Sequence, residues 1–88
     1  MGKKTGRMRM FGHFQKRLFE RYGLHMNHSE LNSHVADILE KRVQFIRWSR
    51  GRSTWRIVHR GYWVYVVFDR RRRVLVTALP FQIFGGKQ

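Results

Sequence analysis

The stretch of sequence that decides the fold is TWRIVHRGYWVYVVFDRRRRVLVTAL, residues 54–79. Apolar and polar side chains alternate along much of it, and β-branched and aromatic residues are abundant, as in half-buried β-strands. Two interruptions of hairpin length, Arg60-Gly61 and residues 70–73, divide the stretch. It therefore predicts three antiparallel strands, at 54–59, 62–68 and 74–79.

The residues before this stretch predict a further strand at 43–48 and a helix at 11–22. Phe14, Leu18 and Tyr22 recur every four residues, which is the spacing of one helix face. The next residue is a glycine, which commonly follows a helix C-terminus because it readily adopts positive φ.

A second helix is predicted at 28–42. Asn27 and Glu30 have the spacing of a capping box, in which each side chain accepts a hydrogen bond from the backbone of the other. The cations Lys41 and Arg42 would then lie in the last turn, where the helix dipole favours positive charge. The apolar residues expected to be buried are Leu31, Val35, Ile38 and Leu39.

Together these elements predict an α+β fold, in which two N-terminal helices pack on one face of a four-stranded antiparallel meander sheet. We expect one domain at 11–80, because 88 residues suffice for a single core. A basic, flexible arm at 1–10 precedes the predicted domain, and a C-terminal tail at 81–88 follows it.

The hairpin turns also predict which residues share a face of the sheet. The first turn pairs Arg56 with Tyr65, and the second pairs Val67 with Val76. The helix-facing side is expected to carry Val43, Phe45, Trp55, Ile57, Tyr62, Val64, Val66, Phe68, Leu75 and Leu79. The opposite side is expected to carry Gln44, Ile46, Trp48, Thr54, Arg56, Val58, Trp63, Tyr65, Val67, Val76 and Ala78. This second face is open to a ligand, buried in a partner or dimer, or covered by the tail.

The charge balance indicates the partner. The chain has 19 Lys and Arg against 5 Asp and Glu, for a formal net charge of +14. Such a chain attracts polyanions, and its arginine excess favours nucleic acid over an anionic membrane surface or an acidic protein partner. We expect RNA in preference to DNA, because no helix-turn-helix recognition helix is evident. The expected location is cytoplasmic, without a membrane span, and the chain is expected to be a monomer or a homodimer.

The sequence suggests neither a metal nor a cofactor. It contains no cysteine, which rules out disulfides and thiolate metal sites. Its histidines lack metal-ligand spacing, and no glycine-rich phosphate loop or paired carboxylates are present.

The candidate nucleic-acid-binding residues are mainly arginines in turns. Residues 70–73 place four arginines side by side, and an anion is their natural neighbour, although a solvated hairpin tip has the same composition. Two more arginines flank Gly51, and the rings of Trp48 and Trp63 offer stacking surfaces for bases. The full set of candidate nucleic-acid-binding residues is Arg17, Arg21, Arg50, Arg52, Trp63, Arg70, Arg71, Arg72 and Arg73.

The candidate catalytic residues are Arg56, Tyr65 and His13. On the predicted aromatic face an arginine would hold a scissile phosphate and a tyrosine would move a proton. His13 lies one helical turn from Arg17, where it is a candidate general base. The alternative is a surface histidine beside an ion pair of Glu20 with Lys16 or Arg17.

The order helix, helix, four-stranded meander resembles the small ribonuclease fold of barnase-like nucleases, colicin-type tRNases and RelE-type toxins. Residues 13–24 and 65–80 also resemble small uncharacterised phage and prophage proteins. The resemblance implies an RNA-binding domain that acts as a metal-independent endoribonuclease of toxin type. The sheet departs from the family in having no glutamate and no lysine. A phage-type protein that inhibits a host nucleic-acid-handling machine without catalysis is the alternative function.

Overall fold

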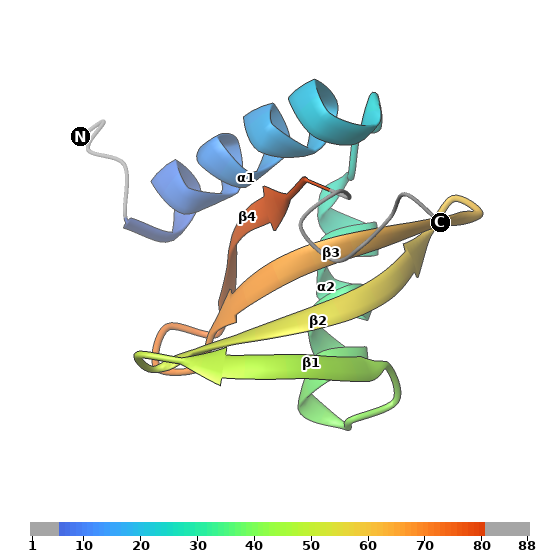
Figure 1. Ribbon diagram of the computed structural model, residues 1–88. Coiled ribbons are helices and arrows are strands. Elements are labelled where there is room, and N and C mark those ends of the chain that lie inside the picture. The colour runs from blue at the N-terminus through green and yellow to red at the C-terminus, as the bar shows by residue number, and fades with distance from the viewer. Residues whose placement is uncertain (1–5, 81–88) are drawn as a thin grey trace.

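The computed structural model describes residues 6–80 and confirms the predicted α+β fold (Figure 1). The elements are α1 (Gly6–Tyr22), α2 (His28–Leu39), β1 (Gln44–Ser49), β2 (Arg52–His59), β3 (Tyr62–Asp69) and β4 (Val74–Leu79). The strands form one antiparallel sheet in the order β1-β2-β3-β4. Helix α1 begins at Gly6 and not at residue 11, so part of the expected arm is helical. The rest of that arm and the tail at 81–88 lie outside the described residues.

Both helices contribute to one core on one side of the sheet. Helix α1 packs along β4, and α2 lies behind the strands in the view of Figure 1. Phe14 and Leu18 of α1 and Ile38 of α2 are buried in this core, as their spacing predicted. The strands add Trp55, Ile57, Val64, Val66, Phe68, Leu75 and Ala78.

The ends of α2 follow the sequence at one terminus and depart from it at the other. The capping box forms, with Glu30 N donating to Asn27 Oδ1 at 2.7 Å and Asn27 N donating to Glu30 Oε1 at 2.8 Å. The helix ends at Leu39, three residues before the predicted end, and Lys41 has a left-handed φ of 59°. Leu39 is therefore the last residue of the helix, and its side chain is 45% exposed. The prediction that Leu39 is buried is wrong.

Two β-bulges change the predicted faces of the sheet. The turns pair Arg56 with Tyr65 and Asp69 with Val74 as expected, but Val67 pairs with Thr77 and not with Val76. Val76 is the extra residue of a bulge, so the side chains after it exchange faces relative to a regular strand. Ala78 consequently lies in the core, and Leu79 pairs with Tyr65 on the opposite side.

The second bulge lies in β1. Phe45 pairs with Trp55 and Arg47 with Thr54, which leaves Ile46 as the extra residue. Trp48 therefore pairs with Ser53 and lies on the helix-facing side. The prediction that it lies on the opposite face is wrong.

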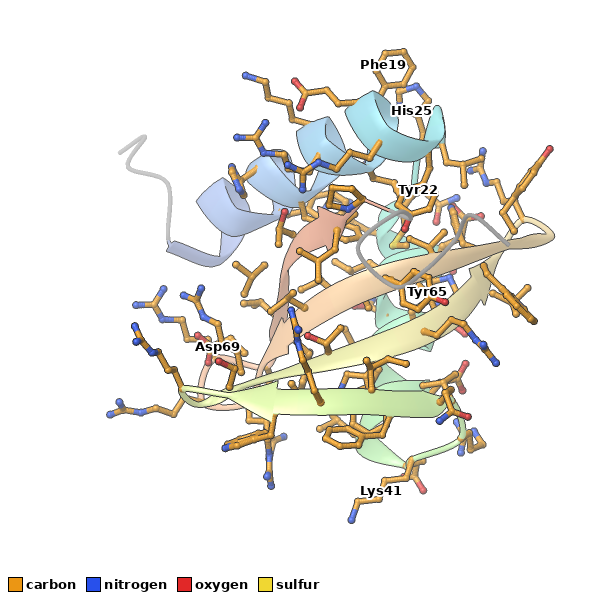
Figure 2. All side chains as sticks on the ribbon, in the orientation of Figure 1. Phe19, Tyr22, His25, Lys41, Tyr65 and Asp69 are labelled. Atoms are coloured by element: carbon orange, nitrogen blue, oxygen red, sulfur yellow. The ribbon has the colours of Figure 1, made fainter. Side chains whose placement is uncertain are left out.

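The hydroxyl of Tyr22 joins α1 to the last paired residues of β3 and β4. It donates to Leu79 O at 2.7 Å and accepts from Tyr65 N at 3.1 Å. Figure 2 shows the Tyr22 side chain reaching from α1 toward the strands. The tyrosine hydroxyl thus bridges a backbone N–H of β3 and a backbone carbonyl of β4 where the pairing of the two strands ends.

Replacing Tyr22 with Phe should destabilise the fold. The substitution keeps the ring but leaves the Tyr65 N–H and the Leu79 carbonyl without this partner, at about 1–3 kcal/mol. For a domain of this size each kcal/mol lowers Tm by roughly 4–8 °C. Thermal unfolding followed by circular dichroism measures the shift. Tyr62→Phe is the matched control, because Tyr62 is 62% exposed and its loss should leave Tm nearly unchanged. Equal Tm values for the two variants would contradict this role of Tyr22.

A histidine pair fastens α2 to the β2–β3 hairpin. The buried His59 Nε2 lies 2.6 Å from His25 O, so this nitrogen carries the proton and donates it. When the other ring nitrogen, His59 Nδ1, carries no proton, it accepts a hydrogen bond from His34 Nε2 across 3.0 Å. Partial burial is the main cause that lowers the pKa of His34, and the neighbouring His59 lowers it further. The carboxylates of Asp37 and Glu30 raise this pKa, but by less.

The lowered pKa of His34 predicts weaker folding in mild acid. The fold favours the neutral form of the His34 ring. The stability that this preference contributes is fully present above the unfolded-state pKa of about 6.5 and is lost as pH falls through the lower pKa of the folded state. We expect Tm to fall between about pH 7.5 and 5.5, and to fall less in His34→Gln, which retains an N–H donor but does not titrate. His13→Gln is the control on the exposed side of α1. A His34→Gln profile identical to wild type would refute this assignment.

Candidate nucleic-acid interface

Six arginines from two separate turns gather at one end of the sheet. The β1–β2 turn supplies Arg50 and Arg52, and the β3–β4 turn supplies residues 70–73. The two turns are adjacent because Arg52 pairs with Ser49 on one side and with Asp69 on the other. Figure 2 shows Asp69 at this end, among side chains tipped with nitrogen. We call these six arginines the basic end.

Asp69 is the only acidic residue within these two turns, 49–53 and 69–74. Its carboxylate accepts a hydrogen bond from Arg72 N at 3.1 Å and lies 3.9 Å from the guanidinium of Arg52. Its carbonyl accepts from Arg73 N at 2.7 Å. One carboxylate therefore organises the β3–β4 turn, but it leaves the positive charge of the basic end largely uncompensated.

Arg50 and Arg73 are held in an unfavourable backbone conformation. Their φ angles are 52° and 57°, in the left-handed region that glycine and asparagine enter more readily. An ordinary L-residue pays roughly 1–2 kcal/mol there. Within the part of the chain that the structure describes, the side chains of Arg50, Arg71 and Arg73 make no hydrogen bond or ion pair. The structure itself thus supplies no contact that accounts for arginine at these positions.

Arg60 provides the contrast at the other end of β2. It occupies the same place as Arg50 in a two-residue turn and has a φ of 51°. Its guanidinium makes two hydrogen bonds of 2.9 Å with the carboxylate of Glu30. That ion pair, with the Asn27 backbone bond, lowers the pKa of Glu30 to about 2. Arg60 therefore has a structural role that Arg50 lacks.

The two exposed tryptophans lie on opposite faces of the sheet. Trp63 is 54% exposed beside Val58, and the Arg56 guanidinium lies 3.9 Å from the centre of its ring. Trp48 is 51% exposed on the helix-facing side, with the Arg70 guanidinium 5.5 Å from its ring centre. The single aromatic face expected from the sequence is therefore divided, and Trp48 belongs with the basic end.

A groove of about 530 Å³ adjoins the basic end. It lies between the C-terminal end of α2 and β1, and Trp48 and Arg70 line it together. Leu39, Lys41, Phe45 and Trp55 are among the other lining residues. Sequence reasoning missed this groove because it depends on the early end of α2 and on the bulge at Ile46. Trp48 and Arg70, which the sequence had already marked as a stacking ring and a phosphate contact, were the available signals.

The candidate catalytic residues are not gathered with the basic end. Arg56 and Tyr65 lie opposite each other on β2 and β3, as predicted, but Tyr65 is only 7% exposed. His13 is on the exposed side of α1, a different element.

The two arginines predicted on α1 have partners within the fold. Arg17 pairs with Glu20 at 2.8 Å, the alternative that the sequence had left open, and this hydrogen bond lowers the pKa of Glu20. Arg21 donates to Ala78 O at 2.7 Å and helps to fasten α1 to β4. Both side chains are therefore already engaged, unlike those of Arg50 and Arg73.

Among residues 6–80 no three His, Asp or Glu side chains are grouped closely enough to hold a metal ion. No helix in the described part of the chain is both long and apolar enough to cross a membrane. No protein-family model, curated protein or solved structure matches the chain. What the structure shows is a small α+β fold of two helices followed by a four-stranded antiparallel meander, and no family is identified for it.

Proposed function

We propose that this protein binds RNA through the basic end. The observation that carries the proposal is the meeting of six arginines from two turns, with two of them held in left-handed conformations without a described polar partner. Residues held in a strained backbone conformation are frequently functional. Binding to a polyanion supplies that function, because it relieves the repulsion among the guanidinium groups.

Phosphate is the anion that this arrangement suits best. Guanidinium groups are planar donors that bind phosphate through two hydrogen bonds, and they are weakly hydrated compared with lysine. Two adjacent turns offer several such donors side by side, which fits a repeating row of phosphates better than a single anion. The resemblance of the element order to that of small ribonucleases supports RNA as the nucleic acid bound.

The proposal concerns binding and not cleavage. Tyr65 is nearly buried, and the guanidinium of Arg56 packs against Trp63, which lies next to the Arg60-Gly61 turn and not at the basic end. These positions give the strand-cleaving hypothesis no geometric support at the basic end. An acidic protein partner, the alternative from the sequence, is an outcome that the following experiment distinguishes.

Arg50→Asn and Arg60→Asn form a matched pair of variants. Each removes one positive charge from the first position of a two-residue turn, and asparagine tolerates the left-handed conformation in both. Arg50→Asn should weaken binding of a labelled 12-nucleotide single-stranded RNA several-fold at about 50 mM salt, measured by fluorescence anisotropy, and should preserve or raise Tm. Arg60→Asn should lower Tm, because Glu30 loses its ion pair, and should leave the affinity close to wild type.

Equal losses of affinity in the two variants would show that overall charge, and not the basic end, determines binding. Poly-glutamate of the same length serves as the competitor that represents an acidic protein. If it displaces the RNA at equal concentration, the preference for nucleic acid is wrong.

A further inference from the structure

We propose that the groove between α2 and β1 takes one unpaired base, stacked on Trp48, from the strand whose phosphates contact the basic end. This inference rests on the proposed function and names its substrate as single-stranded nucleic acid. Four features support it: exposed aromatic surface, the size of the groove, its continuity with the arginines, and the contrast with Trp63.

Large apolar side chains are exposed to solvent in the groove, and exposed apolar surface of this kind is typical of binding sites. Trp48 is 51% exposed, and Phe45 and Leu39 are each 45% exposed. Phe45 is held edge-on to the buried Trp55, with ring centres 5.2 Å apart, so one aromatic wall is fixed by the core. Aromatic side chains of this kind are the stacking platforms on which proteins hold unpaired bases.

The groove has the dimensions and charge of a nucleotide site. Its volume of about 530 Å³ lies within the range of small-ligand pockets, which is roughly 300–1,000 Å³. Its lining places Lys41 and Arg70 with the apolar side chains, and both are cations that suit the phosphates on either side of a bound base.

Arg70 connects the groove to the basic end. It belongs to the β3–β4 turn, lines the groove, and lies 5.5 Å from the centre of the Trp48 ring. A strand that contacts the arginines of the two turns therefore passes the mouth of the groove without leaving the protein surface. A base can enter it only by leaving its helical stack, so the site selects single strands over duplexes.

Trp63 lines a smaller hollow, of about 230 Å³, that includes no residue of the basic end. The Arg56 guanidinium lies 3.9 Å from the centre of its ring and occupies one stacking surface. The residue also lies on the opposite face of the sheet, paired with Val58 near the Arg60 turn. It serves as a control with the same side chain, similar exposure and no connection to the basic end.

The experiment compares two 12-nucleotide strands with the same number of phosphates, one of uridines and one abasic. Wild type should bind the uridine strand roughly 5- to 150-fold more tightly, the range expected for stacking of one base on an aromatic side chain. Trp48→Leu should reduce this ratio toward one and leave affinity for the abasic strand unchanged. Trp63→Leu should keep the wild-type ratio.

Tryptophan fluorescence gives a second readout that does not depend on a Trp48 variant folding correctly. In Trp63→Leu the remaining tryptophans are Trp48 and the buried Trp55, so quenching by the uridine strand, absent with the abasic strand, reports stacking on Trp48.

The outcomes separate this inference from the proposed function. Equal, salt-sensitive binding of both strands by wild type would overturn the base site and leave phosphate binding intact. Failure to bind either strand would overturn both proposals. Quenching of Trp48 by poly-glutamate to the same extent as by the uridine strand would identify the groove as a peptide site and refute the base site.

Discussion

In an antiparallel meander the first and third hairpin turns must lie at the same end of the sheet, because each strand reverses the direction of the chain. Six of the fourteen arginines lie in those two turns, and the pairing of Arg52 with Asp69 joins the turns side by side. Segments about twenty residues apart in sequence thereby form one basic surface. The position of Trp48 beside Arg70 and the continuity of the groove with that surface both depend on this constraint.

The contacts that hold the helices to the sheet lie away from the basic end. Glu30 pairs with Arg60 of the β2–β3 turn, His34 bonds to His59, and Tyr22 bridges the paired ends of β3 and β4. Negative charge is thus used where it stabilises the fold, whereas the two arginine-rich turns hold one carboxylate. This division allows the basic end to bind an anion without breaking the contacts that maintain the core.

The periodicity and turn lengths of the sequence predicted the element order, most strand pairings and the capping box at Asn27, since these depend on local spacing. The predicted assignment of side chains to the two faces of the sheet was wrong beyond the bulges at Ile46 and Val76. One extra residue reverses the alternation of side chains and leaves no mark in the hydrophobic pattern. The arginines of the candidate site were visible in the sequence. Their convergence followed from the meander, but the place of Trp48 beside them required the β1 bulge.

The most direct test of the account is the salt dependence of single-stranded RNA binding. Each phosphate neutralised on a single strand contributes about −0.7 to the slope of log affinity against log salt concentration. If all six guanidinium groups of the basic end contact phosphates, the slope for wild type should approach about −4. A slope between zero and about −1 would contradict the account, because the arginines of the two turns would then not be the binding surface.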